Sequence, residues 1–251
     1  MRDGRAQPTL PLPGPAEVHV HLASLDLPPG EFAAARAILA PDEAARADAF
    51  LRAEDRARFT AARSWLRRLL AAYRGADPAG LAFIYGEHGK PALAGQDGGL
   101  DFNLSHTGGH ALVAVSPGFA IGADIEEVRP IEEKVAGRFF SAAEVAALGA
   151  LPAGERREAF FRCWTRKEAY LKALGSGLAT PLDAFTVSIG PHEPARLLDV
   201  RGSPGEAAAW QIAHLDPGPG LAGALAARRR GWRALPMTMA AASARGSGRG
   251  P

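Results

Sequence analysis

The stretch FAIGADIEEV, residues 119–128, decides how the chain is divided, because it begins a second series of strand, helices and strands. Pro130 stops this strand, and helical sequence follows it. The first series begins in the same way at Val18–Leu25, where apolar residues alternate with two histidines. Each series spans roughly one hundred residues, without a repeat that is visible letter by letter. We therefore predict an α/β (α+β) fold of two similar subdomains, with the ligand site in the cleft between them.

Helices and short strands are expected in the same order within each series. In the first, helices begin at Pro41, with Asp42 as N-cap, and run over Arg52–Arg74, and strands follow at Leu81–Tyr85, Leu100–Leu104 and Ala111–Ser116. The turns GEHGKP (86–91) and SHTGGH (105–110) separate these strands. In the second, helices run over Phe139–Leu148 and Glu155–Leu174, and strands follow at Phe185–Ile189, Trp210–Leu215 and Leu221–Ala227. The predicted domains are an N-terminal subdomain at 17–118, a C-terminal subdomain with the metal-binding motifs at 119–233, and flexible segments at 1–16 and 234–251.

The composition excludes several classes of protein. With 47% hydrophobic residues in 251, the chain can bury a sizeable core, and a net charge of +2 is too small for a dedicated nucleic-acid binder. A single cysteine cannot form an internal disulfide, and no apolar run approaches the ~20 residues that a membrane span requires. We expect a cytoplasmic protein that binds neither membranes nor nucleic acid. Lysine is rare among its basic residues, since the sequence has 4 lysines and 25 arginines.

Asp124 and Glu126 are the first candidate functional residues. In an extended strand, residues two apart share a face, so these two carboxylates project together while Glu127 points away. Oxygen ligands at this spacing suit Mg²⁺, which keeps waters for a phosphate substrate. The alternative is that the pair marks the solvated end of a strand before Pro130.

The stretch FFRCWTRKEAYLK, residues 160–172, places an acid on an apolar helical stripe. On a helix, Glu168 shares a face with Phe161 and Trp164, and Lys172 follows it by one turn. Burying an ionised acid there is costly unless a cation compensates for it. Either Lys172 does so in an ordinary surface ion pair, or Glu168 reaches a metal that the carboxylates of the strand also hold.

A third candidate set lies in residues 89–116, where GKPAL precedes FNLSHTGGHALVAVS. Pro91 holds Lys90 extended, and the Thr-Gly-Gly turn that includes Thr107 can present N–H groups to an anion. Lys90, Ser105 and His106 therefore form a candidate phosphate-binding set. The alternative is that Ser105 and Thr107 only satisfy the turn and that His106 is an ordinary surface histidine.

Three motifs in this order, FNLSHT (102–107), IGADIE (121–126) and WTRKEAYLK (164–172), resemble the Sfp-type 4′-phosphopantetheinyl transferase family. The similarity extends to GKP before the first motif, to RFFS at 138–141, to GLATPLDAFTV at 177–187 and to the DPGPG turn, and covers approximately residues 41–228. The resemblance implies a pseudo-twofold 4′-phosphopantetheinyl transferase fold, two similar subdomains with the active site between them. It also implies a Mg²⁺-dependent enzyme that moves the phosphopantetheine arm of coenzyme A, its substrate, to a serine of an apo carrier protein and releases adenosine 3′,5′-bisphosphate.

The resemblance assigns roles to matching residues. The metal would be held by Asp124, Glu126 and Glu168. Glu168 would also be the general base for the carrier serine, directly or through a water, and Lys172 would stabilise or protonate the leaving phosphate. The coenzyme A phosphates would be bound by a largely basic set, with its two arginines near the adenosine 3′-phosphate: Arg46, Arg58, Lys90, Pro91, Ser105, His106 and Lys172. One position departs from the family pattern, since Glu43 stands where some members carry Lys or Arg, and this leaves the strength of 3′-phosphate binding open.

By the same resemblance, the partners are apo acyl or peptidyl carrier proteins, or carrier domains of polyketide, nonribosomal-peptide or fatty-acid synthases. They would dock near Phe139, Phe140 and the following helix, on a monomer that holds both halves of the cleft. The carriers and pathway served, the breadth of acyl-coenzyme A tolerance and the choice between Mg and Mn are left open. Two other functions compete with this one: a Mg-dependent pyrophosphate hydrolase of nucleotide-like substrates, and an Arg-rich nucleic-acid-binding protein. The dispersed basic residues and three otherwise unexplained motifs count against the nucleic-acid binder.

Overall fold

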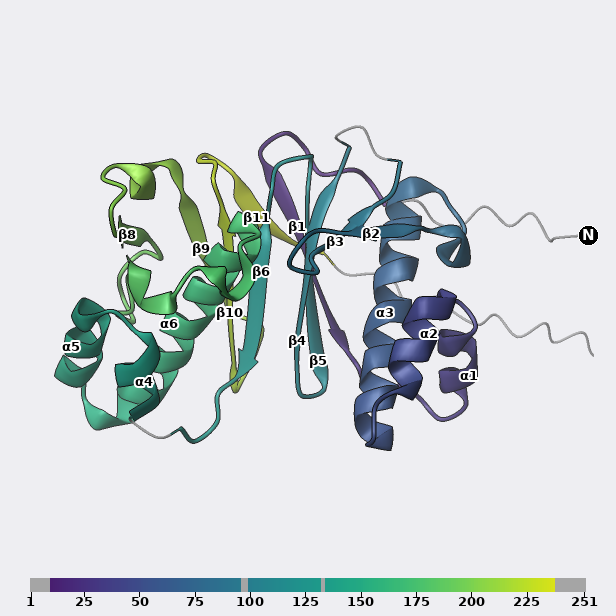
Figure 1. Ribbon diagram of the computed structural model, residues 1–251, viewed down its shortest axis with the longest axis horizontal. Helices are drawn as coiled ribbons and strands as arrows, with labels where there is room; N and C mark the ends of the chain where they lie inside the picture. Colours follow the sequence, from purple (N-terminus) through teal and green to yellow (C-terminus); the bar gives the residue numbers. More distant parts are fainter. Residues whose placement is uncertain (1–9, 96–98, 132–133, 238–251) are drawn as a thin grey trace, which may run out of the picture.

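Two β-sheets form the centre of the molecule, and each is covered on its outer side by one long helix, as Figure 1 shows for this computed structural model. The structure describes residues 10–95, 99–131 and 134–237. One sheet has the strand order β11-β1-β5-β4 and the other β6-β10-β9, with two small hairpins, β2-β3 and β7-β8, beside them. In the described part of the chain, no helix combines the length and the apolarity needed to cross a membrane.

The first half contains β1 (Glu17–Ser24), α1 (Glu31–Arg36), α2 (Pro41–Asp48), α3 (Ala53–Arg74), the 3₁₀ turn η1 (Pro78–Gly80), β2 (Phe83–Tyr85), β3 (Pro91–Leu93), β4 (Asp101–Thr107) and β5 (His110–Ser116). The prediction of Asp42 as N-cap is wrong: the N-cap is Ala40, because Pro41 occupies the first helical position and the Glu43 carboxylate accepts the Ala40 amide at 2.9 Å. The predicted turn at 105–110 is shorter in the structure, because β4 continues to Thr107 and the chain reverses at Gly108 with φ 49°.

The second half contains β6 (Gly122–Glu127), α4 (Lys134–Phe139), α5 (Ala142–Ala150), α6 (Ala153–Leu174), η2 (Gly177–Ala179), η3 (Leu182–Ala184), β7 (Phe185–Val187), β8 (Leu197–Val200), η4 (Glu206–Ala209), β9 (Gln211–Leu215), β10 (Leu221–Ala227) and β11 (Arg233–Met237). The predicted helix over Phe139–Leu148 is two helices. Ser141 separates them as the N-cap of α5: its hydroxyl accepts the Glu144 amide at 3.3 Å, and the Glu144 carboxylate accepts the Ser141 amide at 2.8 Å.

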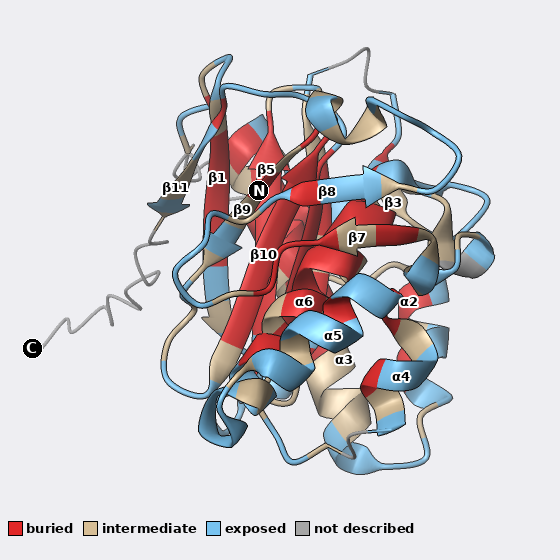
Figure 2. Ribbon diagram, turned by 90° about the vertical axis from the view of Figure 1, so that its left-hand side faces the viewer, coloured by how far each residue is buried: buried red, intermediate tan, exposed pale blue. Residues whose placement is uncertain are grey.

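Strand β5 is apolar on both faces because it is buried on both sides. Val113 and Val115 pack with residues of α3, whereas Leu112 and Ala114 pack with β6 and β10 across the space between the sheets. Each of the valine and leucine side chains contributes ~1.5–3 kcal/mol when it is fully buried. Figure 2 shows these central strands as the most continuously buried part of the molecule.

The two halves repeat the same strand connections. β1 pairs antiparallel with β5 and β5 with β4, and in the same order β6 pairs with β10 and β10 with β9. Helices α3 and α6 both have 22 residues, and both end at a glycine in the left-handed region, Gly75 and Gly175. This repeated order confirms the predicted α/β fold of two similar halves.

Each half contains a buried ion pair that joins a short helix to the 22-residue helix that follows it. The carboxylate of Glu43 in α2 accepts Arg67 Nε of α3 at 2.6 Å, and that of Glu144 in α5 lies 2.8 Å from Lys167 Nζ of α6. Lys167 also donates to the carbonyls of Leu182 and Phe185, at 2.7 and 2.6 Å. Although Lys167 lies within the motif WTRKEAYLK, its ammonium therefore faces the interior of the second half.

The C-terminal strand lies in the first sheet. The sequence predicts a flexible tail from residue 234, but β11 pairs in parallel with β1, from Glu17 opposite Arg233 to His21 opposite Met237. The prediction of a flexible tail is therefore wrong for residues 234–237. Residues 238–251, like residues 1–9, lie outside the described residues. The division at 118/119 stays a prediction.

Gly122 determines how closely α6 approaches β6. A Cβ placed on Gly122 would lie 2.0 Å from the Ala169 carbonyl oxygen and 2.4 Å from the Ala173 amide nitrogen, distances that no side chain tolerates. Only glycine permits this contact between strand and helix. Because Glu168 and Lys172 flank the touching turn of α6, the contact also holds them over β6.

Replacing Gly122 by alanine is expected to lower the free energy of unfolding by about 3 kcal/mol, because backbone atoms of α6 must move to admit the methyl group. Gly154→Ala is the matched control: Gly154 lies in α6, and no atom lies within 4 Å of the place that its new methyl group would take. Removing a helical glycine of this kind stabilises by about 0.5–1 kcal/mol. Denaturant unfolding measures both changes, and equal stabilities for the two variants would contradict the close contact.

Candidate active site

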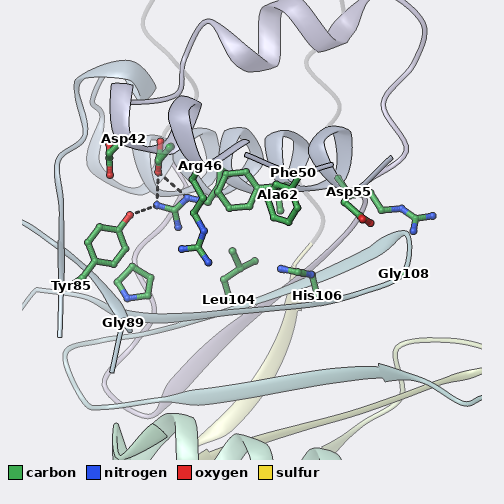
Figure 3. Close-up of a pocket in the computed structure, with 15 residues that line it drawn as sticks. Asp42, Arg46, Phe50, Asp55, Ala62, Tyr85, Gly89, Leu104, His106 and Gly108 are labelled. Atoms are coloured by element: carbon green, nitrogen blue, oxygen red, sulfur yellow. Dashed lines mark hydrogen bonds and ion pairs between the residues drawn. The ribbon is translucent and has the colours of Figure 1, made fainter. Parts of the chain in front are cut away.

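Strand β4 separates two cavities because its side chains alternate between its two faces. Leu104 and His106 point toward α2 and α3, as Figure 3 shows. Ser105 and Thr107 face β6, where their hydroxyls bond the carboxylates of Asp124 and Glu126. One strand thus contributes to both sites.

The first cavity lies between β4, β6 and α6 and has a volume of about 370 Å³. It is lined by Leu104, Ser105, His106, Asp124, Glu126, Trp164, Glu168 and Lys172. Six of these are predicted site residues, which come from three separate segments of the sequence. We call this space the carboxylate cavity.

Lys172 and Ser105 hold one oxygen of Asp124. Lys172 Nζ lies 2.6 Å from Asp124 Oδ1 and donates to Ser105 Oγ at 3.0 Å, while Ser105 Oγ donates to Asp124 Oδ1 at 2.8 Å. Thr107 Oγ1 donates to Glu126 Oε2 at 3.3 Å. Within the described residues, the other oxygen of Asp124, Oδ2, is buried and has no hydrogen-bond partner.

The three acids of the carboxylate cavity all have raised pKa values, and burial is the largest cause for each. Burial is the main cause of the raised pKa of Asp124, and Lys172 opposes it. Burial and then the charge of Asp124 raise the pKa of Glu126, and burial, Asp124 and Glu126 together raise that of Glu168. Burial, Lys172 and Arg46 lower the pKa of His106, so its ring is neutral near pH 7 and can hydrogen-bond an anion.

The donor set of this cavity fits a hard divalent cation. Three carboxylates repel one another, their cations are the Lys172 ammonium on Asp124 and the largely exposed Arg129 guanidinium 3.8 Å from Glu126 Oε2, and a buried oxygen of Asp124 has no partner among the described residues. In the ranges that the structure describes, no three His, Cys, Asp or Glu side chains are arranged so that they could hold a metal as they stand. Because Lys172 Nζ lies 2.6 Å from Asp124 Oδ1, a metal would either bind Asp124 through Oδ2 or displace this ammonium.

The second cavity, about 740 Å³, lies between α2, α3 and β4 (Figure 3). It is lined by Asp42, Glu43, Arg46, Phe50, Asp55, Arg58, Phe59, Ala62, Arg63, Tyr85, Gly89, Pro91, Leu104, His106 and Gly108. Arg46, Arg58, Pro91 and His106 are predicted site residues. Leu104 and His106 line both cavities, so a long ligand could extend from one to the other. We call this space the arginine cavity.

Glu43, the position that departs from the family pattern, has a structural role. It is buried, and both of its oxygens are bound: Oε1 by Arg63, and Oε2 by Arg67 Nε at 2.6 Å. Arg63 also donates to the Tyr85 hydroxyl at 2.9 Å. The carboxylate therefore joins α2 to α3 and orients Arg63 at the wall of the arginine cavity.

Lys90 lines neither the carboxylate cavity nor the arginine cavity. Its Nζ donates to Asp101 Oδ1 and to the Ile121 carbonyl, both at 3.0 Å. It lines a third cavity of about 290 Å³, together with Glu168 and Lys172. A phosphate would have to compete with Asp101 for this ammonium, and the predicted role of Lys90 stays a prediction.

Sequence reasoning missed three residues of the site region. Arg63 lines the arginine cavity, and Asn103 and Thr107 bond β6. A signal for the last two was present in DFNLSHT, where Asp101, Asn103, Ser105 and Thr107 alternate with bulkier residues at the period of a strand. The role of Arg63 depends on Glu43, twenty residues away, and gave no local signal.

Comparison with known proteins places both halves in one family. Residues 120–226 match the 4′-phosphopantetheinyl transferase superfamily, and residues 28–118 match a 4′-phosphopantetheinyl transferase N-terminal family. The chain is 40% identical over 221 residues to 4′-phosphopantetheinyl transferase HetI of Nostoc, covering 86% of this chain and 90% of that protein. It is 29% identical over 189 residues to 4′-phosphopantetheinyl transferase Sfp of Bacillus subtilis, covering 71% and 84%. Among solved structures, Thermotoga maritima holo-[acyl-carrier-protein] synthase aligns with a TM-score of 0.37 and 24% identity, over 45% of this chain and 64% of that one.

Glu43→Lys, which introduces the basic residue found at this position in some members, is expected to destabilise the fold by about 3–5 kcal/mol, because it places a third cation against two buried arginines. Asp42→Lys makes the same change of charge at an exposed neighbour on α2, and should cost about 1 kcal/mol or less. Thermal unfolding of both variants checks this. A Glu43→Lys variant as stable as Asp42→Lys would contradict the structural role of Glu43.

Proposed function

This chain belongs to the 4′-phosphopantetheinyl transferase superfamily and is a 4′-phosphopantetheinyl transferase, and from that premise we propose how its residues bind coenzyme A and a carrier protein. The reaction moves the 4′-phosphopantetheine arm of coenzyme A to a serine of an apo acyl or peptidyl carrier protein and releases adenosine 3′,5′-bisphosphate. One observation carries the assignment of residues: Lys172 and Glu168 of α6 meet Asp124 and Glu126 of β6 in the carboxylate cavity, beside the arginine cavity.

The two cavities suit the two parts of coenzyme A. Arg46, Arg58 and His106 offer cations and a neutral imidazole for the adenosine phosphates, and the Arg46 guanidinium lies 5.5 Å from the centre of the Phe59 ring. The pyrophosphate would then lie at Ser105, His106 and Lys172, where both cavities meet. Pro91 and Lys90, at the start of β3, border the same region.

Charge neutralisation and deprotonation are the tasks of the carboxylate cavity. The carrier serine oxygen would attack the phosphorus that bears pantetheine, its proton would pass to Glu168 directly or through a water, and the bond to the adenosine 5′-phosphate would break. Lys172 would stabilise or protonate the departing phosphate oxygen. Without a metal, burial and the charge of Asp124 raise the pKa of Glu168. A magnesium ion bound by Asp124, Glu126 and Glu168 would neutralise charge on the pyrophosphate.

A carrier protein would dock on the helical face beside the carboxylate cavity. Phe139, at the end of α4, packs edge-on against Trp164 at 5.8 Å between ring centres, and Trp164 lines the cavity. Phe140, predicted to lie at this surface, instead packs in the core on Phe160. Arg138 is exposed beside Phe139 and offers a positive charge to an acidic carrier. We propose a cytoplasmic monomer that serves carriers of polyketide, nonribosomal-peptide or fatty-acid synthesis.

The function is tested by incubating the protein with coenzyme A, Mg²⁺ and a panel of apo carriers and measuring intact carrier masses. We expect wild-type protein to add one phosphopantetheinyl group, and Glu168→Gln to slow transfer about 10²-fold because the base is lost. Glu158→Gln, an exposed acid on the same helix, is the control with unchanged rate. Unmodified carriers throughout would refute the function, and turnover of coenzyme A without a carrier would support the pyrophosphate hydrolase instead. Chelation that leaves the rate unchanged would refute the magnesium requirement.

Arg138→Glu is expected to raise KM for the carrier about tenfold while KM for coenzyme A stays the same, since it reverses a charge at the docking face alone. Arg230→Glu is the control, because Arg230 is an equally exposed arginine in the connection from β10 to β11. Steady-state kinetics in which the carrier and coenzyme A are varied separately gives the two KM values for each variant. An equal rise in both variants would indicate an effect of net charge and reject the proposed docking face.

A further inference from the structure

Strands β4 and β6 are edge strands of different sheets, and side chains join them. Four amides of β6 and its start donate to four side-chain oxygens of β4: Ile121 to Asp101 at 3.1 Å, Ala123 to Asn103 at 2.8 Å, Ile125 to Ser105 at 3.3 Å and Glu127 to Thr107 at 3.2 Å. The partners always lie 20 positions apart in the sequence. We call these four bonds the β4–β6 ladder.

The ladder satisfies amides that the second sheet leaves unpaired. Successive amides of a strand point to opposite edges, so the odd-numbered amides of β6 point away from β10, its partner in the sheet. Direct backbone pairing would bring β4 to about 4.8 Å from β6. A side chain between the two backbones holds the strands further apart and leaves the space in which the carboxylate cavity lies.

The ladder also determines where the carboxylates lie. The ladder holds odd-numbered residues of β6, and each of them is next to an even-numbered residue that faces α6. Ala123, for example, immediately precedes Asp124. Ser105 and Thr107 bond carboxylates directly as well, so changing them would alter the cavity itself. Among the described residues, the buried Asn103 side chain has no hydrogen bond to a carboxylate, and its Oδ1 accepts only the Ala123 amide. Because Asn103 also lines the third cavity with Lys90, Glu168 and Lys172, the test must separate its effect on the backbone of β6 from a direct effect on substrate binding.

We propose that Asn103 is a positioning residue for phosphopantetheinyl transfer: by accepting the Ala123 amide, it holds β6 in the register at which Asp124 and Glu126 face Glu168 and Lys172. This inference rests on the proposed roles of those four residues. Misplacing reacting groups by about 1 Å can cost ~10²-fold in rate. Asn103 would act on turnover and not on the binding of coenzyme A.

The test compares Asn103→Thr with Asn103→Val in the full-length protein. The two side chains have nearly the same shape, but only threonine offers an acceptor, of the kind that Thr107 already supplies in the ladder. We expect Asn103→Val to lower kcat about tenfold or more with KM for coenzyme A nearly unchanged, and Asn103→Thr to stay within about threefold of wild type. In the protein without substrates, the Ala123 amide should exchange with solvent about tenfold faster in Asn103→Val than in Asn103→Thr.

Three results would overturn the proposal. Equal kcat in the two variants would show that the acceptor does not matter, and a higher KM with unchanged kcat in Asn103→Val would make Asn103 a substrate-binding residue. If the Ala123 amide exchanges with solvent at the same rate in both variants, its hydrogen bond to residue 103 is not the cause of a change in kcat. The exchange measurement needs no carrier, so it remains decisive even if the wild-type protein transfers nothing and the proposed function fails. If Asn103→Val does not fold, Asn103→Ser and Asn103→Ala provide the same comparison with smaller side chains.

Discussion

The contact between β4 and β6 joins the two halves and lies between the two cavities. Each strand is the edge of its own sheet, and an exposed edge carries unpaired amides. Side chains of β4 accept those amides, so the halves join without merging into one sheet. The opposite face of β4 holds Leu104 and His106 against the arginine cavity. The strand thereby connects the proposed coenzyme A site to the carboxylate cavity, and the spacing between the two cavities follows from the pleat of a single strand.

Charge is compensated differently in the interior and in the active site. Inside each half, the buried acid that joins the helices has enough cations: Glu43 has Arg63 and Arg67, and Glu144 has Lys167. These groups cross-link the short helix of each half to the long one. The carboxylate cavity instead is lined by three acids and one ammonium, with the largely exposed Arg129 3.8 Å from Glu126 Oε2, and one oxygen of Asp124 is buried without a partner among the described residues. An arrangement that raises the pKa values of its own acids gains little for stability, and it is suited to attracting a further cation.

Much of this could be predicted from the sequence, because the informative residues are close together along the chain. The period of a strand placed Asp124 and Glu126 on one face, and the period of a helix placed Glu168 one turn before Lys172. Predictions were wrong where a distant partner decided the outcome. The Ala40 cap depends on the Glu43 carboxylate, which the arginines of α3 hold in place. Residues 234–237 contain a proline, which cannot donate an amide to a sheet, and they form a strand because β1 offers a free edge.

Local periodicity and motifs in the sequence were enough to predict the order of elements, the repeat of that order and the residue types that gather at the carboxylate cavity. Which lysine faces that cavity could not be predicted in this way, because it depends on packing between distant segments. Lys167 and Lys172 stand five residues apart on α6, yet one is buried against Glu144 and the other reaches Asp124. Five residues turn a helix by well over one full turn, so the two ammonium groups leave different faces. Which face meets β6 depends on the packing at Gly122, where two backbones touch.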